Sequence, residues 1–309
     1  MEKEKEHGKM EKKQTTGHLL AALTILVWGT TYISTKVLLR YFQPVEILIF
    51  RFIIGFLFLI LLNPKPLKVE RKHEIYFIMA GLTGITGYYL LENVALVYTQ
   101  ATNVGVIIAV APFLTAILSH FFLKTEKLHF YFIMGFVLAI IGICMISFNG
   151  SSVFHLNPMG DLLAILAAVV WAIYSIVIKK VSEFGYGSIQ TTRRTFLYGI
   201  LFMIPAMFFM DYHPDYTQFL HMEVMGNILF LGFGASALCF VTWNVAVKRL
   251  GAVKTSIYIY MTPVITTVTS VIVLHEKINL ISVLGIICTM AGLFLSGKKT
   301  VGQKAAHIM

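Results

Sequence analysis

The chain has 309 residues, of which 57% are apolar and only 13% carry a charge, and its formal net charge is +10. A soluble domain usually has about 25% charged residues, so this chain has too little polar surface for water and lipid is its natural solvent. The basic residues lie in short loops and tails, which favours orientation in a membrane over a nucleic-acid partner.

Ten apolar segments are long enough to cross a bilayer as helices. A hydrocarbon core of about 30 Å needs ~20 residues that each rise ~1.5 Å, and lipid cannot satisfy an open backbone. In chain order the predicted spans are 18–40, 44–62, 74–98, 102–123, 129–148, 158–178, 190–210, 223–247, 252–274 and 279–297. A basic tail, 1–17, precedes the first segment, which we interpret as a retained span and not a cleaved signal peptide. A second tail, 298–309, follows the last span.

Lysine and arginine are unevenly divided between alternate loops. With the first tail placed inside, nineteen of them lie in inside segments, while only Arg40 and Lys277 lie in outside loops. This distribution follows the positive-inside rule. It predicts a multi-pass protein of the cytoplasmic (plasma) membrane with both termini cytoplasmic, and it makes the linker 149–157 and the loop 211–223 extracytoplasmic.

The chain contains an internal repeat. Residues 19–36 and 162–179 are identical at eight of eighteen positions, and shifts of 143 to 151 residues match further positions along both halves. The matched pairs include Trp28 with Trp171, Asn93 with Asn244, and Pro112 with Pro263. Each half, 18–148 and 158–297, has five spans, so the second half is inverted relative to the first. Inverted repeats are typical of secondary transporters.

Several short motifs occur in a fixed order. They are Trp-Gly at 28–29, ENVALVYTQATN at 92–103, and Pro112 followed by Glu126-Lys127, a pattern that returns as Pro263 and Glu276-Lys277. In this order, over about 18–297, the chain resembles the EamA-type transporters of the drug/metabolite transporter superfamily. The resemblance implies an all-α integral membrane protein with ten transmembrane helices, arranged as two inverted five-helix repeats around a central cavity. It also implies that helices 1, 3, 4, 6, 8 and 9 line this cavity and that helices 5 and 10 are peripheral.

The leading hypothesis is a secondary transporter that exports a small metabolite, an amino acid or a related compound, by alternating access. The alternatives are a membrane sensor or interaction protein and a lipid-modifying membrane enzyme. The sequence contains no phosphate loop, His-Glu-x-x-His, Gly-x-Ser-x-Gly or Cys-x-x-Cys pattern. We therefore expect no enzymatic activity, cofactor or metal. The expected partners are a small-molecule substrate and membrane lipid, and both proton coupling and facilitated diffusion fit the sequence.

Glu92 is the most informative single residue, because it is an unduplicated acid inside the third span. A charged group at the bilayer centre costs ~2.5–3.5 kcal/mol on insertion scales, so such acids usually face protein or water. Glu92 is therefore a candidate proton carrier or anchor for a substrate amine. In the alternative interpretation it lies near the outer rim and caps a helix or pairs with Lys36 or Arg40.

Aromatic and amide residues inside the spans complete the candidate cavity. Tryptophans of the lipid belt lie at helix ends, so interior ones either line a cavity or pack helices. An amide in lipid needs a partner, which is the substrate, a backbone carbonyl or the other asparagine. The candidate set is Trp28, Tyr32, Tyr88, Glu92, Asn93, Trp171, Tyr174, Trp243, Asn244 and Tyr258.

Two prolines and two arginines are also placed within spans. Pro112 and Pro263 are expected to kink their helices, as bend points for transport or as static features. Arg51 and Arg194 lie early in spans 2 and 7. For these two we favour snorkelling or binding to carbonyls over a role in the cavity.

Overall fold

The computed structural model describes residues 2–99, 101–123, 130–147, 157–210, 212–274 and 280–296, and all regular secondary structure in those ranges is helical. The first half contains α1 (Glu2–Leu38), α2 (Pro44–Leu62), η1 (Arg71–His73), α3 (Glu74–Ala80), η2 (Gly81–Gly87), α4 (Tyr88–Tyr98), α5 (Ala101–Ile108), α6 (Ala111–Phe122) and α7 (Phe130–Ser147). The second half contains α8 (Pro158–Glu183), α9 (Ser188–Phe209), η3 (Tyr216–Leu220), α10 (Met222–Leu229), η4 (Phe230–Leu238), α11 (Cys239–Leu250), α12 (Ala252–Ser256), η5 (Ile257–Tyr260), α13 (Met261–Leu274) and α14 (Leu280–Ser296).

These elements form the ten spans. Within the described ranges, five helical stretches are long and apolar enough to cross a membrane: Lys12–Leu38, Pro44–Leu62, Val104–Phe122, Pro158–Glu183 and Met222–Leu250. Two shorter apolar helices are Phe130–Ile146 and Leu280–Ser296. The basic tail is continuous with the first span, because α1 already begins at Glu2 and the tail is rich in the helix formers Glu and Lys.

Four spans are segmented, and the segmentation is the same in both halves. The third span combines α3, η2 and α4, and the eighth combines α10, η4 and α11. Both η2 and η4 are π-helical, and the 151-residue shift carries 81–87 onto 232–238. Wide turns of this kind are rare and are often found at functional sites, so their duplication indicates a shared role.

The fourth and ninth spans are interrupted directly before their prolines. Pro112 lies in the first turn of α6, after a break at 109–110, and Pro263 is the third residue of α13, after the 3-10 turn η5. Proline is tolerated in the first turn of a helix because the N–H it lacks would have no partner there. Breaks between helices therefore replace the predicted kinks, and each proline lies in the first turn of the helix that follows the break.

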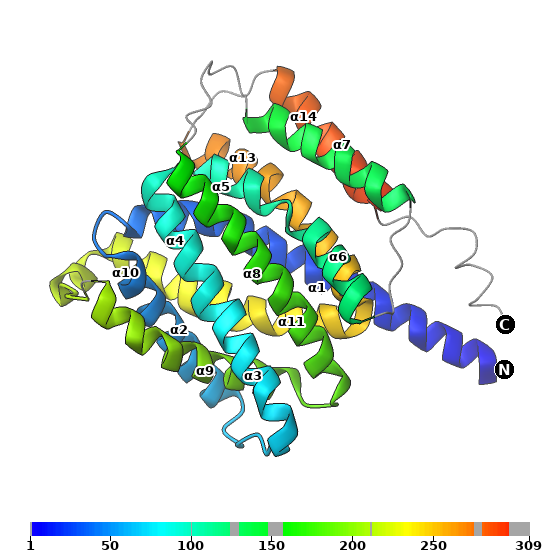
Figure 1. Cartoon of the computed structure of the whole chain (residues 1–309), viewed down its shortest axis with the longest axis horizontal. Coiled ribbons are helices and arrows are strands. Elements are labelled where there is room, and N and C mark those ends of the chain that lie inside the picture. Colours follow the sequence, from blue (N-terminus) through cyan, green and yellow to red (C-terminus); the bar gives the residue numbers. More distant parts are fainter. Residues whose placement is uncertain are drawn as a thin grey trace.

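The two halves pack with pseudo-two-fold exchange, as the arrangement in Figure 1 shows. α4 packs against α8, and in the exchanged pair α11 packs against α1; likewise α2 packs on η4 and α9 on η2. Each repeat therefore lends its first helix to the third span of the other. The core lies at this interface between repeats.

α7 and α14 form a peripheral pair, seen at the upper right of Figure 1. Their backbones approach closely at glycines: a Cβ added to Gly142 would lie 2.5 Å from the carbonyl oxygen of Gly285. Small residues permit such approach between helices in lipid. Glu126 and Glu276, which precede these helices, lie outside the described residues.

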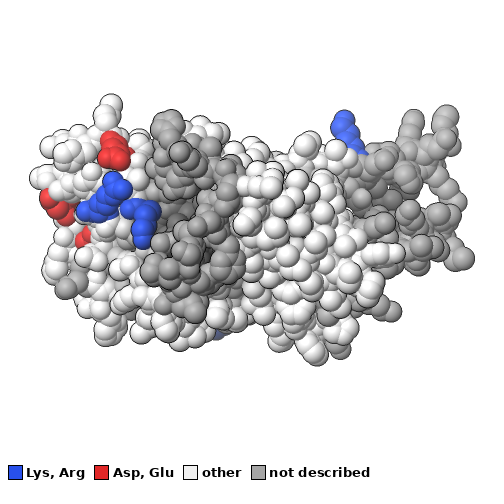
Figure 2. All heavy atoms as spheres, turned by 90° about the horizontal axis from the view of Figure 1, so that it is seen from above, with Lys and Arg blue, Asp and Glu red and all other residues white. Residues whose placement is uncertain are grey.

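The surface is apolar across the middle of the molecule. Large apolar side chains are exposed on most spans, for example Leu57 on α2, Val137 on α7 and Leu201 on α9. In Figure 2 most charged side chains of the visible face gather toward its left end, and most described residues across its middle are white. Such a band is expected of a surface solvated by lipid.

Candidate functional site

A small cavity lies among the first, third, fourth, sixth and ninth spans. Its volume is about 30 Å³, far below the roughly 300–1,000 Å³ of pockets that hold drug-sized ligands. The lining residues are Ile25, Trp28, Thr31, Tyr32, Tyr88, Tyr89, Glu92, Ile108, Trp171, Ile259 and Thr262. The cavity is therefore too small for a metabolite in this conformation, and the helices must move apart to admit one.

Glu92 is the acid of this cavity and is only 6% exposed. The hydroxyl of Tyr88, one turn earlier on α4, donates to Glu92 Oε1 at 3.2 Å. Tyr32, on α1, lines the same cavity. The hydroxyl of a tyrosine is a suitable donor for a buried carboxyl group. The spacing of Tyr88 and Glu92 by four residues places both on one face of the helix.

Lys36, the partner considered for Glu92 at the outer rim, bonds elsewhere. Its Nζ donates to the carbonyl oxygen of Leu96 at 2.6 Å and lies 3.5 Å from that of Thr99. Both carbonyls belong to the end of α4, where backbone acceptors lack helical partners. Lys36 therefore ties the end of the third span to α1.

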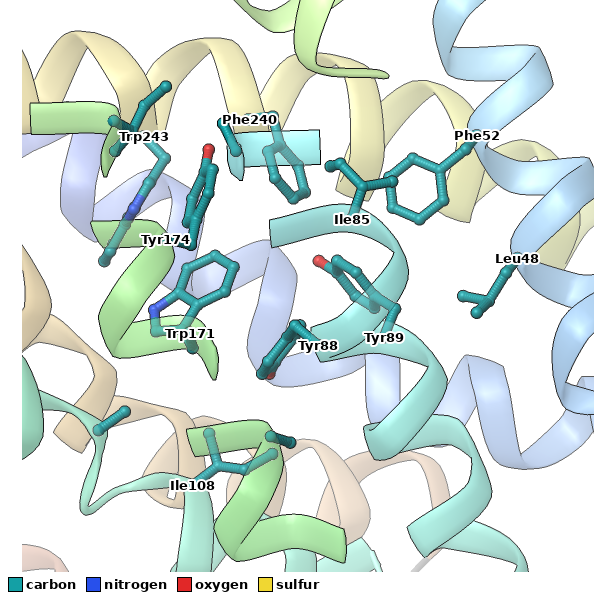
Figure 3. Close-up of a cluster of buried hydrophobic side chains, with 14 of the residues drawn as sticks. Leu48, Phe52, Ile85, Tyr88, Tyr89, Ile108, Trp171, Tyr174, Phe240 and Trp243 are labelled. Atoms are coloured by element: carbon teal, nitrogen blue, oxygen red, sulfur yellow. The ribbon is translucent and has the colours of Figure 1, made fainter. Parts of the chain in front are cut away.

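Aromatic rings form much of the cavity wall, and Figure 3 shows Tyr88, Tyr89 and Trp171 among them. The rings of Trp28 and Trp171 meet edge to face with centroids 5.3 Å apart, and Trp243 lies 5.1 Å from Trp28. Tyr88 lies 4.7 Å from Trp171, which joins the acid to the ring cluster. The repeat-related tryptophans of α1 and α8 thus meet at the interface between halves, while Trp243 packs behind them.

Trp28 is also fixed by its indole nitrogen. Nε1 donates to the carbonyl oxygen of Ala235 at 2.9 Å, and Ala235 lies in the π-helical η4. A π-helix changes the pairing of its carbonyls relative to an α-helix. The duplicated π segment therefore contacts the cavity wall directly.

Arg51 enters the same cluster from α2. It is 1% exposed, its Nε donates to Ser236 Oγ at 2.9 Å, and its guanidinium carbon lies 4.4 Å from the centre of the Tyr89 ring. One terminal nitrogen, Nη2, has no hydrogen-bond partner among the described residues. The sequence interpretation favoured snorkelling to the surface or carbonyl contacts, whereas Arg51 is directed inward to a serine and a tyrosine.

Five sequence candidates do not line the cavity: Asn93, Tyr174, Trp243, Asn244 and Tyr258. Asn244 accepts from Tyr174 at 3.0 Å and donates to Thr192 at 2.9 Å, so it cross-links three spans. Asn93 lies 3.4 Å from the carbonyl of Pro44, and the hydroxyl of Tyr258 lies 2.8 Å from His18 Nδ1. Tyr174 and Trp243 pack against the aromatic wall without lining the cavity.

Sequence reasoning omitted Tyr89, Thr31 and Thr262 from its candidate set, and these do line the cavity. Tyr89 adjoins Tyr88, and Thr31 precedes Tyr32. Adjacency to a candidate residue was the sequence feature that could have identified these two. In the described part of the chain no group of three His, Cys, Asp or Glu side chains could hold a metal ion. The site offers one acid, tyrosine hydroxyls and aromatic faces.

Ten helices in two inverted repeats around a buried polar cavity define a membrane transporter fold. The EamA-like transporter family matches residues 15–148 and again 158–297, one match for each repeat. The chain belongs to the EamA-like transporter family.

Relatives agree with this assignment along most of the chain. The transporter YyaM of Bacillus subtilis is 30% identical over 85% of this chain and 88% of its own length. A transporter of Archaeoglobus fulgidus is 25% identical over 91% and 97%. A protein of Streptantibioticus cattleyicolor named a probable terminal-alkyne amino-acid exporter is 25% identical over 91% and 93%. A solved crystal structure covering 91% of this chain and 96% of its own superimposes with a TM-score of 0.73 at 19% identity, and so shares the fold.

Proposed function

We propose that this transporter exports a small metabolite with an amino group, an amino acid or a related compound, by alternating access. The observation that carries the proposal is the buried Glu92 at a cavity walled by aromatic rings. A carboxylate pairs with an ammonium group, and aromatic faces attract the same cation. No second acid competes for the cation among the residues that line the cavity.

Alternating access is supported by the exchange symmetry of the two repeats. Each half supplies a first helix, α1 or α8, to the third span of the other half. A conformation open to one side then has a counterpart of similar packing open to the other side. We infer that the structure, with its small cavity, lies between these two conformations. The outward direction draws on the relative named a probable exporter.

Proton exchange provides a driving force for this site. Glu92 binds either a proton or a substrate cation, since both need the same carboxylate. The Glu92 carboxyl group then carries a proton on the inward step and the substrate on the outward step. Exchange of one proton for one substrate cation moves no net charge, so the pH gradient drives it, and one pH unit yields ~1.4 kcal/mol, enough for about a tenfold gradient.

The first experiment is an export screen that compares metabolites outside cells that overproduce or lack the protein. The metabolite found is then loaded into reconstituted vesicles with wild type, Glu92→Gln, or the control Glu223→Gln, an exposed acid at the start of α10. We expect Glu92→Gln to insert normally but to lose pH-driven concentrative transport, and the control to retain it. Unchanged rate and unchanged pH dependence in Glu92→Gln would exclude this role.

A further inference from the structure

A second, larger cavity lies between α2 and α9, at the end of the molecule where α2 ends and α9 begins. Its volume is about 270 Å³. Phe56, Ile60 and Leu197 form an apolar wall, and Arg193 and Arg194 lie at its polar edge. This cavity is separate from the aromatic one and shares no lining residue with it.

The two arginines differ in how their charge is compensated. Arg194 forms an ion pair with Glu74, its Nη2 lying 2.6 Å from the carboxylate oxygen. Arg193 donates instead to the backbone carbonyl oxygens of Asn63 and Lys65, and neither acceptor carries a charge. No ion pair of Arg193 is found in the described ranges.

Arg193 therefore keeps its positive charge and its spare donors. A guanidinium has five N–H donors, and two nitrogens bonded to carbonyls do not use them all. The bonds also hold the group in one orientation at the edge of the cavity. Lys65 and Lys68 on the adjoining loop add to the positive potential. A fixed, uncompensated guanidinium of this kind is suited to phosphate.

An exposed apolar stripe leads from this cavity along α9. Leu197, Leu201, Ile204 and Phe208 follow each other at intervals of four, three and four residues, and therefore share one helix face. Leu201, Ile204 and Phe208 are 48%, 44% and 83% exposed. Eleven residues rise by about 16 Å, roughly half of the ~30 Å hydrocarbon core. The stripe is as long as one leaflet is thick.

We propose that this cavity binds one anionic phospholipid from the leaflet at the lysine- and arginine-rich end of the molecule. The phosphate contacts Arg193 and one acyl chain follows Leu197 and the stripe beyond it. A free phosphate ion would leave the wall of Phe56 and Ile60 against water, whereas a lipid covers it. Basic pockets between spans at this depth are suited to anionic head groups.

The test is a lipid titration of the purified full-length protein, followed by native mass spectrometry. Dioleoyl phosphatidylglycerol is compared with dioleoyl phosphatidylcholine, so that only the head-group charge differs. In the wild type we expect the anionic lipid to bind at least about fivefold more tightly, the factor for one basic group near a membrane surface. Arg193→Gln should remove this preference.

Two further variants separate the site from bulk charge and from misfolding. Leu197→Trp keeps the arginine but fills the cavity, so it should also weaken binding of the anionic lipid, by roughly tenfold. Lys254→Gln removes one exposed positive charge elsewhere and should leave binding unchanged. If Arg193→Gln does not fold, Leu197→Trp decides the question alone.

Three results would overturn the proposal. The first is equal affinity of the wild type for both lipids. The second is wild-type affinity for the anionic lipid in Leu197→Trp or in folded Arg193→Gln. The third is displacement of the lipid by inorganic phosphate alone at a comparable concentration, which would make this an ion site without a role for the acyl chain.

Discussion

The guanidinium of Arg51 lies over the ring of Tyr89, 4.4 Å from its centre, deep inside the bundle. Tyr89 and Glu92 line the same cavity. Arg51 and Glu92 come from helices of opposite direction and are both almost completely buried. Tyr89 thus contacts a buried positive group and lines the cavity of a buried acid.

Removal of Arg51 should destabilise the protein through Glu92. A buried charge left without its counter-charge costs ~3–5 kcal/mol, so we expect Arg51→Met to lower the thermal midpoint markedly. Adding Glu92→Gln to Arg51→Met should recover part of the loss. Thermal unfolding of both single variants and the double variant in one detergent measures the coupling. Additivity within about 0.5 kcal/mol would show that the two groups are independent.

The hydrogen bond from Trp28 to Ala235 should hold α1 against η4. Trp28→Phe keeps an aromatic ring in the cluster but removes the Nε1 donor, leaving a buried carbonyl without that partner. We expect a loss of about 1–3 kcal/mol in the free energy of unfolding. The matched control is Trp171→Phe, since Trp171 Nε1 has no hydrogen-bond partner among the described residues. Equal losses in both variants would assign the effect to ring size.

The contact of α7 with α14 should be intolerant of a single methyl group. In Gly142→Ala the new Cβ would meet the backbone of Gly285 and Thr289 at 2.5 Å, so the helices must separate, at a cost of roughly 1–3 kcal/mol. Gly226→Ala adds the same group to α10, where nothing lies within 4 Å, and should be neutral or slightly stabilising. Thermal unfolding compares the two, and an equal response would contradict the packing described.

Orientation is tested by cysteine labelling after Cys144, Cys239 and Cys288 have been replaced by alanine. Leu220, 86% exposed in η3, belongs to the loop expected outside, and Lys68 to a basic loop expected inside. A membrane-impermeant maleimide should label Leu220→Cys in intact cells and Lys68→Cys only after permeabilisation. The opposite pattern would reverse the orientation.

Much of the fold follows from hydropathy and the repeat. Apolar length alone locates the spans, and Trp28 and Trp171, a matched pair in the candidate cavity set, both line the cavity. The segmentation of the spans was not predictable in this way, because the π-helical segments η2 and η4 give the same hydropathy signal as an apolar α-helix. Pro112 and Pro263 indicated a disturbance, but a proline in a helix and a proline after a break have the same local sequence.

The candidate site was predictable where polarity itself is informative. Glu92 and Tyr88 are unusual residues for a lipid-facing span, and both line the cavity. Asn244 is equally polar but bonds to Tyr174 and Thr192, and no spacing rule distinguishes that from a substrate contact. The inward direction of Arg51 depends on Ser236, which is 185 positions away, so local pattern could not reveal it.

The paired π segments also affect how relatives of this protein are to be aligned. A π turn corresponds to an α-helix that has accommodated an inserted residue. A relative with one residue fewer between Gly81 and Gly87 would therefore have a regular α-helix at this point, and α3 and α4 would keep their relative orientation. Its counterparts of Tyr88 and Glu92 would still share one helix face, because both follow the deletion and are four residues apart. A single gap at this point, in either half, therefore marks a relative that has lost the wide turn but kept the residues of the cavity in register.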